Sequence, residues 1–338
     1  MRSTLDPGGA AQEAASVQPR RSVDGRLVVL LVVVALGARG MVGGALDPVA
    51  LRTWTTVFVA IVIQALPFLA LGVLVSGAIT ALVSPALLER VLPHSTLLAV
   101  PSAALAGTAL PGCECASVPI AGRLCARGVQ PAAAVTFMLA APAVNPVVLV
   151  ATAVAFPGQP QMVLGRFLGS LLTSIVVGLA WSRVGGQGWV ARARQRLAST
   201  AGDGRGWVGF AGAARHDLWD AGGWLVVGAA AAATLQVLVP RSWLLAVAGQ
   251  PVLAVLALAG LAVVLAICSE ADAFVAASLR EFSLTARLVF LVVGPAVDVK
   301  LIAMQTGVFG RRFAARFAPL TFAVAVLCAV AVAEVVLR

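Results

Sequence analysis

Two cysteines separated by a single glutamate are the residues of this sequence best suited to hold a soft ligand. Cys113, Glu114 and Cys115 follow Pro111-Gly112, a pair that breaks helices. Thiolates are good ligands for soft metal and metalloid ions, and the carboxylate between them adds a negative charge. The pattern predicts contact with a thiophilic solute. The alternative is two small cysteines buried at a tight turn.

A second polar group directly follows a long apolar run in the other half of the chain. It consists of Cys268, Ser269, Glu270 and Asp272. Carboxylates within membrane segments are costly unless they face a polar interior, so they are candidates for function. We take all four residues as candidates for solute contact. The alternative is a solvated position at the far membrane interface.

A third group consists of Asn145 and Asp298, each three residues after a helix-breaking proline. Asp298 lies 11 residues after Arg287 and 13 before Arg311, which at about 1.5 Å per residue places it near the bilayer centre. Lys300 is two positions farther on. Residues at i and i+2 of a helix point to different faces, so we expect these two charges to find partners across the molecule. Uncompensated, each would cost about 2.5–3.5 kcal/mol, so a polar cavity or an ion pair is required; a purely structural ion pair is the alternative.

These carboxylates could also carry protons. A buried carboxylate is costly in its charged form, so Asp298, Glu270 or Glu114 could couple proton entry to solute exit. We predict no metal site, no cofactor and no catalytic residue. The two histidines, His94 and His216, lie at the ends of apolar segments, and the sequence has no HExxH or serine–histidine set.

The composition shows what must position these residues. Of 338 residues, 60% are hydrophobic and 11% charged, whereas soluble domains carry about 25% charged residues. The chain is therefore expected to be an all-α polytopic membrane protein. Its net charge of +10 comes almost entirely from arginines at the ends of apolar runs, which is typical of cytoplasmic loops. No basic stretch is interleaved with aromatic residues, so we predict a partner in membrane lipid and none in nucleic acid.

Charge and hydropathy divide the chain into five parts. Residues 1–25 are predicted to be a disordered cytoplasmic tail, and residues 26–46 a first transmembrane helix rather than a cleaved signal. Transmembrane repeats are expected over 54–184 and 218–338. A basic cytoplasmic loop, 185–217, joins them and carries Arg192, Arg194, Arg196, Arg205 and Arg215.

The two halves of the chain are related in sequence. A gapless shift of 153 positions aligns several distant residues at once. The aligned residues are Cys115 with Cys268, Arg127 with Arg280, Phe137 with Phe290, and Pro142-Ala143-Val144-Asn145 with Pro295-Ala296-Val297-Asp298. This register predicts an internal duplication.

Charge also predicts how the repeats are oriented. With the N-terminus and the basic loop in the cytoplasm, residues 96–130 are best placed as a hairpin that re-enters the membrane or spans it twice. Each repeat then makes an odd number of full crossings, so the second is inverted relative to the first. Inverted repeats with broken helices are a recurring plan of transporters, whose site lies at mid-membrane between the halves.

Two long motifs in these repeats resemble the signatures of one family. The first is Pro111-x-Cys113-x-Cys115 with Val118-Pro119, then Phe137-x-Leu139-Ala140-Ala141-Pro142-x-x-Asn145-Pro146. The second is Cys268-Ser269-Glu270-Ala271-Asp272-Ala273-Phe274, then Gly294-Pro295-x-x-Asp298-x-Lys300. Over residues 55–335 the chain resembles the predicted permease family that includes the ArsP-type organoarsenical exporters.

The resemblance implies a multi-spanning permease of the inner or plasma membrane. In the ArsP branch it implies efflux of trivalent organoarsenicals, with thiols as metalloid contacts. Cys113 and Cys115 match the family's paired cysteines. The family commonly has a small polar residue between them where this chain has Glu114, a negative charge that a neutral methylated arsenical does not call for.

The leading prediction is a permease, not an enzyme, that moves a small solute, with efflux of a thiophilic metalloid or organoarsenical as its specific form. The sequence has no G-x-x-x-x-G-K-[ST] loop, so ATP-driven transport would need a partner subunit. One alternative is a membrane-embedded thiol redox protein, although Cys-x-Cys is not the usual Cys-x-x-Cys spacing. Another is an assembly or scaffold component.

Overall fold

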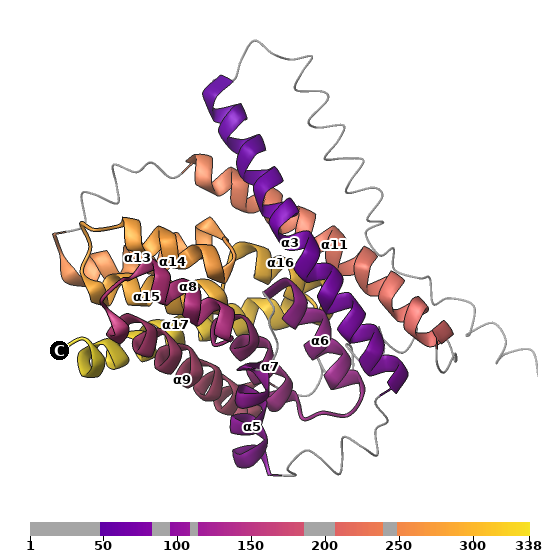
Figure 1. The fold of residues 1–338 in the computed structure, drawn as a ribbon. Helices are drawn as coiled ribbons and strands as arrows, with labels where there is room; N and C mark the ends of the chain where they lie inside the picture. Colours follow the sequence, from indigo (N-terminus) through magenta and orange to yellow (C-terminus); the bar gives the residue numbers. More distant parts are fainter. Residues whose placement is uncertain (1–47, 83–94, 109–113, 186–206, 239–248) are drawn as a thin grey trace, which may run out of the picture.

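The described part of the chain is entirely α-helical in a computed structural model (Figure 1). The structure describes residues 48–82, 95–108, 114–185, 207–238 and 249–338. The predicted tail, the first helix over 26–46 and Cys113 lie outside these ranges. The prediction of an all-α fold is confirmed.

Helices of the first half begin mostly at proline, whose fixed φ and missing N–H suit the first helical position. They are α3 (Pro48–Leu82), α5 (Thr96–Thr108), α6 (Glu114–Ala126), α7 (Pro131–Ala143), α8 (Pro146–Ala155) and α9 (Pro160–Val184). The second half contains α11 (Trp207–Leu238), α13 (Pro251–Leu265), α14 (Ser269–Ser278), α15 (Leu284–Ala296), α16 (Val299–Phe309) and α17 (Arg311–Val336). Because α11 begins at Trp207, the last part of the predicted loop 185–217 is helical.

The same shift of 153 positions that aligns the sequences also aligns the helices. It carries α7, 131–143, onto α15, 284–296, without a residue of difference, and the start of α8 at 146 onto that of α16 at 299. The remaining pairs are α3 with α11, α5 with α13, α6 with α14, and α9 with α17. The duplication therefore extends to the order and spacing of the helices, while the inversion of the second half stays a prediction.

Each half contains a helix broken at the predicted position. In the first, α7 ends beyond Pro142, and the Asn145 side chain caps α8 by accepting a hydrogen bond from the Val148 N–H at 3.0 Å. In the second, Asp298 caps α16 by accepting from the Leu301 N–H at 2.5 Å. The proline ends one helix and the polar side chain starts the next.

Six stretches of the described residues are long and apolar enough to cross a membrane. Those formed by α7–α8 and α15–α16 are inner helices, with 78% and 83% of their apolar stretch buried, against 28–50% for the other four. Large apolar side chains point outward from the remaining helices, among them Ile63, Leu97, Val252 and Leu327. Lipid is the solvent for such a surface, so the chain is a multi-pass membrane protein.

Two long helices, α3 and α11, lie side by side and cross the rest of the molecule (Figure 1). Helix α3 packs on α6, and α11 packs on α16. Both contacts are close. A Cβ added at Gly72 would lie 2.5 Å from the Cα of Ala116, and one at Gly228 would lie 2.7 Å from the Cα of Lys300. The α3–α11 pair therefore supports the beginnings of α6 and α16.

Candidate functional site

Four short helices, α6, α8, α14 and α16, begin in the interior with polar residues. Glu114 is the first residue of α6, Ser269 that of α14, and Asn145 and Asp298 cap α8 and α16. The helices pack as two pairs that each combine one helix from each half, α6 with α16 and α8 with α14. Helix N-termini carry a partial positive charge and favour carboxylates nearby. This explains why acidic residues lie at the starts of three of these helices: Glu114 in α6, Glu270 and Asp272 in the first turn of α14, and Asp298 at the cap of α16.

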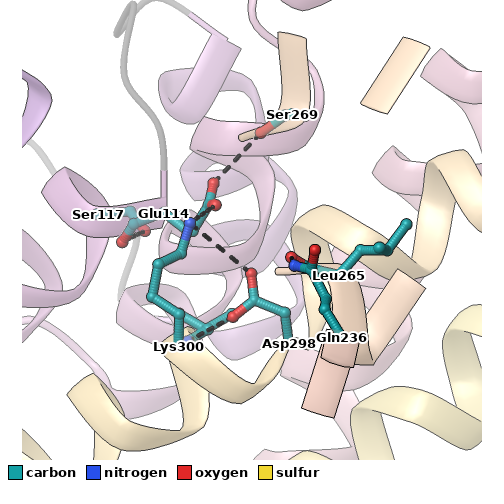
Figure 2. Close-up of polar contacts among 8 residues, drawn as sticks. Glu114, Ser117, Gln236, Leu265, Ser269, Asp298 and Lys300 are labelled. Carbon is teal, nitrogen blue, oxygen red and sulfur yellow. Dashed lines mark hydrogen bonds and ion pairs between the residues drawn. The ribbon is translucent and has the colours of Figure 1, made fainter. Parts of the chain in front are cut away.

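An ion pair joins the two halves of the molecule at the centre of this arrangement. The ammonium of Lys300 donates to Glu114 Oε1 at 2.6 Å and lies 4.0 Å from Asp298 Oδ2. Figure 2 shows the Lys300 ammonium between the two carboxylates, with Ser269 donating from above to Glu114 Oε2 at 3.3 Å. All four residues are 0% exposed. Lys300 thus finds its nearest carboxylate on the other half, as expected, whereas Asp298 forms an ion pair with Lys300 itself, against the expectation of a partner across the molecule.

Two of the four cysteines that the structure describes lie near this ion pair. Cys115 and Cys268 are buried and have free thiols, and both are within electrostatic range of Lys300. Cys115 directly follows Glu114, and Cys268 directly precedes Ser269. The two thiols that the shift of 153 positions aligns therefore stand at the starts of equivalent helices, each within electrostatic range of Lys300.

The carboxylates of α14 form a second charged group close to the first. Asp272 is 2% exposed, and its carboxylate lies against Gly294, where an added Cβ would meet Oδ2 at 2.5 Å. Glu270 is half-buried. Both carboxylates interact electrostatically with Arg166, Glu114 and Lys300.

Sequence reasoning missed Arg166, which lies in α9 and is 0% exposed. Its guanidinium donates to Thr152 Oγ1 at 2.8 Å and to the carbonyl oxygen of Ser269 at 2.7 Å. Ser269 in turn donates to Glu114, so hydrogen bonds run from α8 and α9 through α14 to α6. The available signal was an arginine inside the apolar run 162–184, at its fifth residue, because charges within membrane segments often mark functional sites.

The side chain of Asn145 differs from those of the other predicted residues in that it hydrogen-bonds to backbone groups close to it in the chain. Its amide donates to the Ala141 carbonyl at 3.1 Å, and its side-chain oxygen accepts from Val148. These bonds bridge the break between α7 and α8. The position equivalent to Asp298 is thus a neutral cap, and the structure gives it a local structural role.

A separate buried ion pair, also missed from the sequence, connects α3, α6 and α11. Arg123 donates to both carboxylate oxygens of Asp217, at 3.1 and 2.7 Å, and Ser76 donates to the same carboxylate at 2.5 Å. Here one cation meets one carboxylate, with two hydrogen bonds between them. Arg123 is nine residues along α6 from Glu114, about 14 Å at 1.5 Å per residue. We therefore assign this pair to the packing of the helices.

The residues of the polar centre are buried. A hollow of about 660 Å³ lies elsewhere, between mostly apolar side chains of α8 and α9 that include Leu149, Phe156 and Phe167. Within the described ranges, no group of three His, Cys, Asp or Glu side chains could hold a metal ion. The charged centre thus holds two carboxylates and one ammonium between the two halves, away from solvent.

Comparison with known proteins gives a consistent result. A family model of the ArsP type, described as a predicted permease, matches residues 50–334. UPF0718 protein YcgR of Bacillus subtilis (strain 168) is 36% identical over 278 residues, which cover 81% of this chain and 94% of that protein. A protein of Streptococcus mutans serotype c named as a putative two-component membrane permease complex subunit is 31% identical over 77% of this chain and 88% of its own length. No solved structure matches the chain.

Proposed function

The chain belongs to the ArsP-type family of predicted permeases, and from that premise we propose that it moves a small solute across the cell membrane through the charged centre between its two halves. The observation that carries the proposal is the buried Glu114–Lys300 ion pair, which joins α6 of one half to α16 of the other. If the second half is inverted, rocking of the halves would open this centre to each side in turn. We place the N-terminus and the basic loop in the cytoplasm, following the arginine bias.

The solute that the thiols favour is a thiophilic metalloid or an organoarsenical. Cys115 and Cys268 come from equivalent positions of the two halves and lie beside Lys300. A trivalent arsenical binds thiols by exchanging its oxygen ligands for sulfur, which fits a site with thiols on both moving halves. Efflux is the direction that such a toxic solute calls for.

Proton coupling is the second part of the proposal. Glu114 and Asp298 share one ammonium, so full ionisation leaves one negative charge without a partner in a buried place, which is costly. Uptake of a proton would remove that charge. A proton entering from outside could thereby drive a solute out.

A partner subunit is a further possibility that one observation favours. The relative from Streptococcus mutans is named as a subunit of a two-component permease complex. We propose that this chain also works with a second component, which copurification of the tagged chain from its own cell would test. A single chain that transports alone in vesicles would contradict this part of the proposal.

Transport in vesicles tests the proposal directly. We expect the tagged chain, purified together with any second component that copurifies and placed in liposomes, to move one solute from a panel of arsenicals, antimonials and soft metal ions, with flux that depends on the proton gradient. Flux should fall at least tenfold in Cys115→Ser, Cys268→Ser and Asp298→Asn. Cys328→Ser, which changes a buried thiol of α17, is the matched control and should keep full flux.

Two outcomes would contradict the proposal. Full flux in Asp298→Asn with an unchanged proton dependence would remove that carboxylate from the coupling. Vesicles without flux for any solute, together with a changed thiol state of partner proteins in cells, would favour the redox alternative.

A further inference from the structure

The charges of the centre fall into two groups that meet at Ser269. In the first, Glu114 and Asp298 lie 2.6 and 4.0 Å from the ammonium of Lys300. In the second, Glu270 and Asp272 of α14 lie within electrostatic range of the guanidinium of Arg166. Ser269 connects the groups, because its hydroxyl donates to Glu114 and its carbonyl accepts from Arg166.

Each group has two carboxylates and one cation. The first is completely buried; in the second, Arg166 is 0% and Asp272 2% exposed, and Glu270 is half-buried. The charged side chains within electrostatic range of Asp272 are Arg166 from α9, Glu114 from α6, and Asp298 and Lys300 from α16. Two carboxylates and two cations therefore act on Asp272. With Glu270 counted in the second group, full ionisation leaves one negative charge in excess in each group.

One carboxylate oxygen in each group has no hydrogen-bond donor among the described residues. These atoms are Asp298 Oδ2 and Asp272 Oδ2, and both are buried. The Nε–H of Arg166 also donates to no described residue, so the guanidinium and the Asp272 carboxylate do not complete a bidentate pair. Buried polar atoms are almost always satisfied, so in each group one carboxylate oxygen bears a negative charge that no hydrogen bond from the described residues stabilises.

We infer that Asp272 with Arg166 and Glu270 forms a second proton site, separate from the Glu114–Lys300–Asp298 site, so that the permease binds two protons. The inference rests on the proposed function and adds to it a second proton site and the number of protons bound. In each site a hydronium ion of the aqueous phase gives its proton to one carboxylate, so that an O–H bond forms, a water molecule is released, and one ionised carboxylate is left facing one cation.

A proton fits these sites better than a metal cation. Hard cations such as Ca²⁺ take six to eight oxygen ligands, whereas each site offers two carboxylates beside a positively charged side chain that repels a metal ion. A proton needs only one oxygen. Once bound, it removes the buried negative charge that no hydrogen bond stabilises at Asp272 Oδ2 and Asp298 Oδ2.

Infrared spectroscopy of the full chain in liposomes counts these protons, because a protonated carboxylic acid has its own C=O band. The titration runs from about pH 9 to about pH 6, where exposed carboxylates stay ionised. We expect a band that halves in Asp272→Asn and in Asp298→Asn and disappears in the double variant. Glu334→Gln removes an exposed carboxylate of α17 and should leave the band unchanged.

Variants at Arg166 give an independent reading if Asp272→Asn does not fold. Arg166→Gln keeps amide donors but removes the cation, so one more carboxylate must be neutralised and the band should grow by about half. Arg166→Lys keeps the charge and should leave the count at two. If Arg166 had only a structural role, both variants would change in stability, and the intensity of the C=O band would change in neither.

The outcomes separate this inference from the function on which it rests. A full band in Asp272→Asn together with a band that disappears in Asp298→Asn would overturn the second site and leave the first intact. A band that neither variant changes would overturn proton coupling altogether. A band abolished by Na⁺ or K⁺ at constant pH, with N-methylglucamine as the control cation, would show a metal cation in the sites and overturn the inference.

Discussion

Lys300 is the residue whose removal should most disturb the centre. Its ammonium lies 2.6 Å from Glu114 and 4.0 Å from Asp298, and all three side chains are at most 1% exposed. Lys300→Met keeps the length of the side chain but leaves both carboxylates without a cation. Removing one partner of a buried ion pair costs about 3–5 kcal/mol. At roughly 2 °C per kcal/mol for a chain of this size, the melting temperature should fall by about 6–10 °C.

The second half of this prediction concerns the double variant. Glu114→Gln combined with Lys300→Met removes both charges of the pair, so most of the lost stability should return. The loss in Lys300→Met should also shrink as the pH falls, because protons then neutralise the carboxylates that the variant leaves uncompensated. Tryptophan fluorescence of the detergent-solubilised protein, heated at one fixed rate, measures all three proteins.

A surface ion pair provides the control. Arg338 and Glu334 form an exposed pair one helical turn apart, and such pairs contribute about 0–1 kcal/mol. Arg338→Ala should therefore melt within about 2 °C of the wild type. The reasoning would be refuted if Lys300→Met also melted within that range, or if the double variant were no more stable than Lys300→Met.

Three further predictions concern the helices around the centre. Gly228→Ala should cost about 1–3 kcal/mol and reduce flux, because its Cβ would meet the backbone of α16; Gly212→Ala, in open space on the same helix, should be neutral or slightly stabilising. Asn145→Ala should lose about 1 kcal/mol in a thermal melt because it removes the cap of α8, and Asn145→Ser should recover most of it. Arg123→Met should lose about 3–5 kcal/mol of stability because Asp217 loses its buried partner. The flux per folded molecule should nevertheless persist. Loss of flux in a variant of unchanged stability would instead show that this ion pair takes part in transport.

Much of the fold could be predicted from the sequence, because the two halves of the chain share aligned residues at one fixed spacing. The register that aligns Cys115 with Cys268 and Asn145 with Asp298 also aligns the helices, and the prolines before Asn145 and Asp298 mark where helices break. The start of α11 was less accessible. It lies in a polar stretch, and hydropathy alone cannot distinguish the polar end of a long helix from a loop.

Most residues of the site could be predicted from the sequence, but which of them form ion pairs with each other could not. Asp298 and Lys300 stood out as charges in an apolar segment, and their spacing indicated partners on another helix. That the partner of Lys300 is Glu114, 186 positions away, depends on how α6 packs on α16. Arg166 was overlooked because one arginine near the end of an apolar run looks like an interfacial residue that reaches water; only the packing of α9 on α8 and α15 shows that it points inward.

The central claim, that the buried pair of Glu114 and Lys300 faces each side of the membrane in turn, can be tested on Lys300 itself, the single lysine of the sequence. A membrane-impermeant amine reagent is applied to one face of oriented vesicles and then, in a separate experiment, to the other, with peptide mapping to exclude the α-amine. The account predicts slow modification of Lys300 from both faces, and faster modification in Gly228→Ala, which loosens α16. Modification from one face alone, or none at all in vesicles that transport solute, would contradict it.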